Sequence, residues 1–206
     1  MNRYVFGITG ASGALLGLRL VEELIKKHEV HLVVSRDAIS IVKDETSLDI
    51  SKDPQGCLRE YFKTECLYFY KNDNFYSPVA SGSFITQGMF VVPCSMKTLS
   101  GIANGYGNTL IERAADVTIK EGRRLLLSPR EMPFSPIHLE NMLRLARIGV
   151  IIAPPVPAFY HRPDEIREVV DFLCGKMLDA FGIENKLYKR WDTQRPLLTK
   201  VDGNTP

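Results

Sequence analysis

A short apolar strand near the start of the chain runs directly into a glycine-rich turn. Tyr4-Val5-Phe6 is followed by Gly7-Ile8-Thr9-Gly10-Ala11-Ser12-Gly13, and a helical pattern then extends from Ala14 to Lys27. The backbone N–H groups at a helix start lack intrahelical partners and lie at the positive end of the helix dipole. The turn is therefore predicted to form an anion site, where glycines let a ligand approach the backbone.

The spacing of these glycines narrows the kind of ligand. Gly7-x-x-Gly10-x-x-Gly13 is neither the G-x-G-x-x-G dinucleotide fingerprint nor the G-x-x-x-x-G-K-[ST] phosphate loop. Ser12 adds a hydroxyl, which can donate and accept hydrogen bonds. The alternative interpretation is an ordinary strand-to-helix turn in which Ser12 only caps the helix.

Composition excludes several partner classes. A chain of 206 residues with 45% hydrophobic residues is long enough for one domain with a sizeable core. Its formal net charge of +2 is too small to indicate a nucleic-acid partner. The sequence does concentrate cations in one region, at Arg113, Lys120, Arg123, Arg124 and Arg130. That cluster favours a small anionic ligand.

The cysteines and the apolar runs predict a cytoplasmic protein. Cys57, Cys66, Cys94 and Cys174 follow no metal-binding spacing and form no dense disulfide framework, so they are interpreted as reduced thiols. Cys94 is interpreted as a small buried residue at a strand end. The chain shows no targeting signal before its first strand, and prolines interrupt the longest apolar stretch, residues 148–159. No membrane association is expected.

Apolar strands and amphipathic helices alternate along the chain. Strands are expected at residues 4–6, 30–34, 89–92, 124–127 and 149–153, with a possible strand at 67–70. Helices are expected at 14–27, 38–45, 96–103, 109–121 and 136–147. Residues 46–74 are expected to be an irregular, variable and exposed segment. The alternation predicts an α/β fold with a Rossmann-like (flavodoxin-like), doubly wound parallel sheet in a single domain.

In such a sheet, ligands bind beyond the carboxyl ends of the strands. The loops expected there carry hydroxyls, charges or prolines: Thr9 to Gly13, Ser35, Pro93 to Thr98, Pro129 to Glu131, and Pro154 to Tyr160. We expect Lys120 and Arg130 to hold a phosphate dianion together, with Arg130 supplying a bidentate fork. The alternative for Lys120 is a solvated cation at a helix C-terminus.

Several motifs together resemble one family, the flavin prenyltransferases of the UbiX and Pad type. They are Thr9-Gly10-Ala11-Ser12-Gly13, Pro93-Cys94-Ser95, Glu112-Arg113-Ala114-Ala115-Asp116, Pro129-Arg130-Glu131 and Ile137-His138-Leu139-Glu140-Asn141-Met142. The resemblance extends from Tyr4 to Trp191. It implies a flavoprotein domain over residues 1–191 and a C-terminal tail over 192–206.

The resemblance also implies an activity and its partners. Proteins of this family transfer a dimethylallyl group from dimethylallyl phosphate to N5 and C6 of reduced FMN. They form homododecamers and pass prenylated FMN to a UbiD-type decarboxylase. The same expectations are made for this chain.

Position by position, the resemblance assigns site residues. Cofactor-binding candidates are Gly10, Ala11, Ser12, Ser35, Ser95, Met96, Lys97, Thr98, Arg113 and Arg130. Substrate-binding candidates are Lys120, Arg130, Glu131, Tyr160 and Lys176. Catalytic candidates are Ser12, Glu45, Lys120, Glu131 and Trp191. Lys176 stands where the family usually has arginine, so it offers a point charge instead of a fork.

The residue types suit this chemistry. Loss of an allylic phosphate requires cations at the leaving oxygens and a group that handles a proton, roles that Lys120, Arg130 and Glu131 match. Trp191 would offer an aromatic face to an allyl cation. No Asp-Asp-x-x-Asp run is present, so we expect no metal.

Structural roles and other functions remain open at this point. Glu45 is also interpretable as a solvated helix-end acid, Trp191 as a packing anchor, and Tyr160 as a loop residue that covers the core. Two alternative functions also remain open. One is a flavin-dependent cysteine decarboxylase, although its Pro-x-Met-Asn-x-x-Met-Trp signature is missing. The other is a flavin carrier without catalytic activity.

Overall fold

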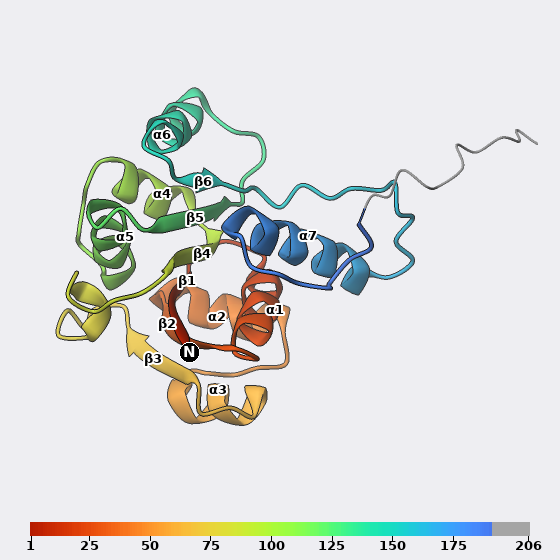
Figure 1. Cartoon of the computed structure of the whole chain (residues 1–206), viewed down its shortest axis with the longest axis horizontal. Helices are drawn as coiled ribbons and strands as arrows, with labels where there is room; N and C mark the ends of the chain where they lie inside the picture. The colour runs from red at the N-terminus through yellow and green to blue at the C-terminus, as the bar shows by residue number, and fades with distance from the viewer. Residues whose placement is uncertain (191–206) are drawn as a thin grey trace, which may run out of the picture.

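A six-stranded sheet forms the centre of the molecule (Figure 1). The computed structural model describes residues 1–190. All strand pairs are parallel, and the strand order is β3-β2-β1-β4-β5-β6. The strands are β1 (Asn2–Ile8), β2 (His28–Val34), β3 (Leu67–Lys71), β4 (Gly88–Cys94), β5 (Arg124–Pro129) and β6 (Ile151–Ile152). This order confirms the predicted Rossmann-like, doubly wound sheet.

The strand order reverses next to β1. From β1 the chain proceeds outward through β2 to β3, and it then returns to place β4 on the other side of β1. Ile8 pairs with Val34 on one side, while Gly7 pairs with Val91 on the other. The loops after β1 and β4 therefore leave the carboxyl edge of the sheet in opposite directions, and we call the region between them the crevice.

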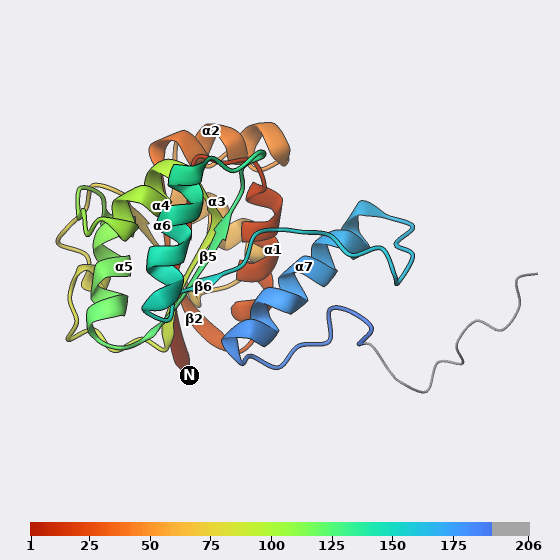
Figure 2. The same ribbon diagram turned by 90° about the horizontal axis from the view of Figure 1, so that it is seen from above.

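Helices cover both faces of the sheet (Figure 2). One face packs against α1 (Ala14–Leu24), α2 (Arg36–Glu45), α3 (Pro54–Phe62) and α7 (Ile166–Phe181). The other face packs against α4 (Met96–Ala103), α5 (Leu110–Lys120) and α6 (Pro136–Arg147). The short 3₁₀ helix η1 (Pro78–Ala80) packs against α5. Alternate residues of each strand point into the two resulting cores, because side chains alternate across a strand.

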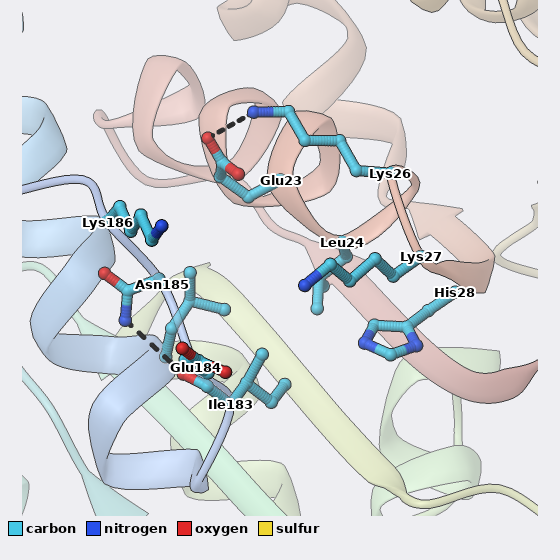
Figure 3. Close-up of a pocket in the computed structure, with 10 residues that line it drawn as sticks. Glu23, Leu24, Lys26, Lys27, His28, Ile183, Glu184, Asn185 and Lys186 are labelled. Atoms are coloured by element: carbon cyan, nitrogen blue, oxygen red, sulfur yellow. Dashed lines mark hydrogen bonds and ion pairs between the residues drawn. The ribbon is translucent and has the colours of Figure 1, made fainter.

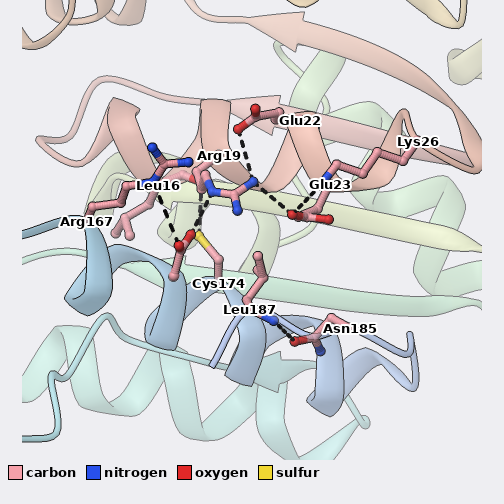
Figure 4. Close-up of polar contacts among 10 residues, drawn as sticks. Leu16, Arg19, Glu22, Glu23, Lys26, Arg167, Cys174, Asn185 and Leu187 are labelled. Carbon is pink, nitrogen blue, oxygen red and sulfur yellow. Dashed lines mark hydrogen bonds and ion pairs between the residues drawn. The ribbon is translucent and has the colours of Figure 1, made fainter. Parts of the chain in front are cut away.

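Helix α7 was not predicted from the sequence, and it covers part of the same sheet face as α1. It packs on α1, where the Arg19 guanidinium lies between carboxylates of both helices (Figure 4). Arg19 donates to Asp171 of α7 at 2.7 Å and pairs with Glu23 of α1 at 2.9 Å. The Cys174 thiol donates to the Leu16 carbonyl, and burial raises its pKa to about 12. These contacts fix the position of α7 on the sheet.

The segment at residues 46–74 is more ordered than expected. It contains α3 and β3, and Ile50, Leu58 and Leu67 are fully buried in the first core. The expected irregularity is therefore wrong where α3 forms, whereas β3 confirms the possible strand at 67–70, and most residues of the segment are exposed or half-buried. Its sequence variability remains a prediction.

Within residues 1–190, no helix has both the length and the apolar character needed to cross a membrane.

Candidate functional site

Several helices begin at the carboxyl edge of the sheet, and serines cap two of them. Ser35 follows β2, and its hydroxyl accepts a hydrogen bond from the Ala38 N–H at 3.2 Å, which caps α2. Ser95 follows β4 and caps α4 by accepting from the Thr98 N–H at 3.3 Å. The positive ends of α1, α2 and α4 therefore face one crevice, which favours an anionic ligand.

Thr9 fixes the two sides of this crevice to each other. Its N–H and its hydroxyl both donate to the Pro93 carbonyl, at 3.2 and 2.9 Å. The same hydroxyl accepts from the Ser95 N–H at 2.7 Å. Thr9 is only 1% exposed, so these bonds are shielded from water. The sequence analysis placed Thr9 in the turn but assigned it no role.

Gly10 is held against the start of α2. A Cβ atom at this position would lie 2.8 Å from the Asp37 Cβ, which is too close for any side chain without a shift of the backbone. The lack of a side chain at Gly10 therefore lets the turn pack closely against α2. Next to it, Ala11 is buried and Ser12 is exposed at the crest of the turn.

The start of α1 is occupied by the protein's own carboxylate. The two carboxylate oxygens of Glu45, the last residue of α2, accept from the Gly13 N–H at 2.9 and 3.1 Å. One of them also accepts from the Ala14 N–H at 2.8 Å. The negative charge complements the positive end of α1. These two N–H groups are thus not free for a ligand, and Glu45 is not a freely solvated helix-end acid.

Arg130 and Glu131 follow β5 at the same edge, and both side chains are exposed. The Arg130 N–H donates to the Cys94 carbonyl at 3.2 Å, which ties this loop to the end of β4. The Arg130 guanidinium makes no bond to any residue of the range 1–190. Cys94 itself is fully buried, and burial raises the pKa of its thiol, so it is a packing residue as predicted.

Lys120 lies at the other end of β5, so it does not meet Arg130 within one chain, and their expected pairing stays a prediction. Lys120 ends α5, which leads into the first residue of β5, whereas Arg130 follows its last residue. A strand rises about 3.3 Å per residue, so β5 separates the two cations by roughly 20 Å. Lys120 instead pairs with Glu121 at 2.5 Å.

Three other candidates lie on elements that do not form the turns after β1, β2, β4 and β5. Arg113 donates to the Ala80 carbonyl at 3.1 Å and pairs with Asp116 at 2.8 Å, so it fixes η1 to α5. Tyr160 lies on the irregular segment 153–165, which runs outward from β6 (Figure 1), and its ring centroid is 5.9 Å from that of Phe172. Lys176 is exposed on α7. Trp191 lies outside the described residues.

A loop next to Lys120 was not singled out from the sequence. Arg123 donates to the carbonyls of Gly82 and Phe84, at 2.7 and 2.9 Å. A Cβ atom on Gly82 would lie 3.0 Å from the Lys120 Nζ. The loop at residues 80–84 and Lys120 thus form one surface at the amino edge. Within residues 80–84, the only sequence feature that indicates a loop is the run Ser81-Gly82-Ser83.

The amino edge also carries a hollow of about 320 Å³ between the ends of α1 and α7 (Figure 3). Lys26, Lys27, His28 and Lys186 line it. Because Lys26 and Lys27 precede β2 and His28 begins it, the hollow lies at the opposite edge from Ser12 and Ser95. Among residues 1–190, no three His, Cys, Asp or Glu side chains cluster as a metal site would require.

Comparison with known proteins places this geometry in a family. The Flavoprotein family model matches residues 1–178. A flavin prenyltransferase UbiX from Methanocaldococcus jannaschii is 47% identical over 186 residues, covering 90% of this chain and 96% of the relative. The chain belongs to the UbiX flavin prenyltransferase family.

Solved structures agree with this assignment. One is described as AnUbiX (PadA1) in complex with FMN and dimethylallyl pyrophosphate. It is 42% identical, with a TM-score of 0.85, and the match covers 93% of this chain and 97% of that one. Another, a dodecameric FMN-dependent UbiX-like decarboxylase from Escherichia coli O157:H7, has a TM-score of 0.84 at 42% identity, with 92% and 99% covered. The carboxyl edge of this UbiX-family chain is therefore its candidate active site.

Proposed function

We propose that this chain transfers a dimethylallyl group from dimethylallyl phosphate to reduced FMN and that a UbiD-type decarboxylase receives the product. The likeness to AnUbiX, whose structure holds FMN and dimethylallyl pyrophosphate, carries the proposal. The capped helix starts and the exposed Arg130 at one crevice support it independently.

The crevice has the donors that FMN needs. Gly10 lets the turn pack closely against α2, and the Ser35 and Ser95 turns present backbone N–H groups at helix starts. We assign the flavin to the positions that the family resemblance names: Gly10, Ala11, Ser12, Ser35, Ser95, Met96, Lys97, Thr98 and Arg130. Reduced flavin supplies the nucleophilic N5 and C6 atoms.

The residues of the chain then have distinct tasks. Arg130 neutralises the leaving phosphate, and a cation there lowers the barrier because charge develops on the leaving oxygens. Glu131, next to it, handles the proton of the phosphate as the C–O bond breaks. Glu45, bound to the Gly13 N–H, holds the turn that carries Ser12, and these two side chains move the proton released during ring closure.

A second copy completes the site. Lys120, Tyr160 and Lys176 match substrate positions, yet in one chain Lys120 lies at the opposite edge from Arg130, and Tyr160 and Lys176 lie on the outward segment and on α7. A homo-oligomer brings such surfaces together, and the UbiX-like neighbour from Escherichia coli O157:H7 is described as dodecameric. We propose a dodecamer in which these side chains and Trp191 approach the crevice of another copy.

Cationic side chains replace a metal in this mechanism, and the free thiols of all four cysteines suit the cytoplasm. The test is mass spectrometry of flavin after anaerobic incubation of the protein with reduced FMN and dimethylallyl phosphate. The expected result is the mass of prenylated FMN, formed equally with and without EDTA. Unmodified FMN that stays bound indicates a flavin carrier instead.

A further inference from the structure

A second hollow, of about 460 Å³, lies over the carboxyl ends of β2 and β3. We call it the β2–β3 hollow. Its apolar floor consists of Val34, Ile39, Pro54 and Phe69. Val34 and Arg36, which both line it, flank Ser35, so the hollow opens directly beside the proposed flavin crevice.

Three cations line this hollow without a partner. Arg36, Lys52 and Lys71 are exposed, and none of them makes an ion pair or a side-chain hydrogen bond within residues 1–190. Other cations in this part of the molecule are paired: Lys43 binds Asp49 at 2.7 Å, and Arg59 binds Glu65 at 2.9 Å.

The lining of the hollow holds fewer carboxylates than cations. Asp49 is already bound by Lys43, and Asp53 accepts from the Gly56 N–H at 3.0 Å as the cap of α3. Asp73 is the acidic residue among those that line the hollow. The hollow therefore carries an excess of positive charge at the edge where the flavin enters.

We propose that the β2–β3 hollow captures the phosphate group of FMN as the flavin enters the neighbouring crevice. This inference rests on the proposed function, because it requires FMN to be the ligand. A phosphate monoester is a dianion near neutral pH, and a concave site lined by cations raises the local concentration of such a ligand and its association rate. The effect weakens as salt screens the charges.

The test is the association rate of FMN, followed by stopped-flow quenching of flavin fluorescence at low ionic strength. In the triple variant Arg36→Ala, Lys52→Ala, Lys71→Ala, the association rate constant of FMN is expected to fall about tenfold, with a weaker salt dependence. Riboflavin, which lacks the phosphate, is expected to associate at an unchanged rate. The charge-preserving variant Arg36→Lys, Lys52→Arg, Lys71→Arg is expected to restore FMN association.

A matched control removes the same charge from the opposite edge. The triple variant Lys26→Ala, Lys27→Ala, Lys186→Ala strips three cations from the hollow of Figure 3 and is expected to associate with FMN as the wild type does. An equal slowing in both triple variants would indicate a global charge effect and overturn the proposal. So would equal slowing of FMN and riboflavin, or no slowing at all.

A further measurement separates FMN from the other phosphate compound. With FMN already bound at saturation, the first triple variant is expected to keep the wild-type kcat/KM for dimethylallyl phosphate. A fall in that value with unchanged FMN association would assign the hollow to the prenyl phosphate and overturn the proposal. If the proposed function is wrong, the wild type forms no prenylated FMN. The role of the hollow is tested independently, because FMN association is measured without turnover.

Discussion

The two ends of β5 carry arginines in contrasting environments. At the amino end, Arg123 donates to the carbonyls of Gly82 and Phe84, and Arg124 donates to the Phe181 carbonyl. At the carboxyl end, the guanidinium of Arg130 makes no bond to the described part of the chain. Cations that bind carbonyls of the same chain hold the fold together, whereas a cation left without a partner at a strand's carboxyl end is available to a ligand. The arginines of the amino edge are thus structural within one chain, and the carboxyl edge is the candidate site.

The largest expected effect is at the carboxyl edge. Glu131→Gln keeps the size of the side chain and its hydrogen bonding but cannot exchange a proton. Single-turnover formation of prenylated FMN, with both ligands saturating, is expected to slow by about 10²–10⁴-fold, while FMN binding and folding persist. Glu60→Gln, on the exposed end of α3, is the matched control and is expected to react at the wild-type rate. A wild-type rate in Glu131→Gln would make Glu131 a structural partner of the nearby cations.

A pH effect on stability is expected from His31, midway along β2. Its ring stacks on Tyr68 with centroids 5.0 Å apart, its Nδ1 lies 3.0 Å from the Tyr70 hydroxyl, and it is 5% exposed. Burial lowers the pKa of His31 to about 4, and the charge of Arg3 adds to this effect against an opposing contribution from Glu29. Because the folded-state pKa lies below the ordinary value of 6.5, the unfolded chain binds more protons between these values.

Stability should therefore fall as the pH is lowered from about 6.5 to about 4, by on the order of 3 kcal/mol from this residue. Urea unfolding of the wild type and His31→Phe across this range is the measurement. Phenylalanine keeps the ring between the tyrosines but does not titrate, so its slope of stability against pH should be smaller. Equal slopes in the two proteins would show that His31 does not titrate on unfolding.

The two ends of β5 can be compared directly by truncating one arginine at each. Arg124→Ala removes a charged hydrogen bond to the Phe181 carbonyl and is expected to lower the free energy of unfolding by about 1.5–3 kcal/mol, with FMN affinity unchanged. Arg130→Ala is expected to show the reverse pattern, with near wild-type stability and weaker FMN binding. Thermal unfolding and FMN titration of both variants test this. The contrast fails if Arg130→Ala is the more destabilised of the two.

The smallest expected effect is at the helix caps. Ser95→Ala and Ser135→Ala each remove an N-cap hydroxyl, at α4 and α6, and each is expected to cost about 1 kcal/mol of stability. Of the two, Ser95→Ala is also expected to weaken FMN binding, because Ser95 lies at the crevice. Equal FMN affinity in the two variants would remove Ser95 from the cofactor site.

Much of the fold was predictable because its signals are local. Apolar runs located the strands, and Ser135 with Pro136 marked the start of α6, where the structure shows a capping box with His138. Helix α7 has the same kind of signal, since Val170, Leu173, Cys174, Met177 and Leu178 recur at helical spacing and are buried. The sequence pattern of α7 agrees with its structure, so this helix could also have been predicted.

The arrangement of the site was less predictable. The alternation of strands and helices correctly placed Ser12, Ser35, Ser95 and Arg130 at one edge, because parallel strands end together. Within one chain Lys120 lies at the opposite edge, because a helix that leads into a strand ends there, so its place beside Arg130 stays a proposal for the assembly. The bond between Glu45 and the Gly13 N–H joins residues 32 positions apart and depends on the packing angle of α2, which no local pattern specifies.

That bond has a consequence for cofactor discrimination. In dinucleotide-binding Rossmann folds, the pyrophosphate lies against the N–H groups at the start of the first helix. Here the carboxylate of Glu45 already occupies those groups in this chain, so a pyrophosphate in that position would meet a like charge and lose its donors. The same contact that steadies the turn therefore disfavours a dinucleotide bound in that position.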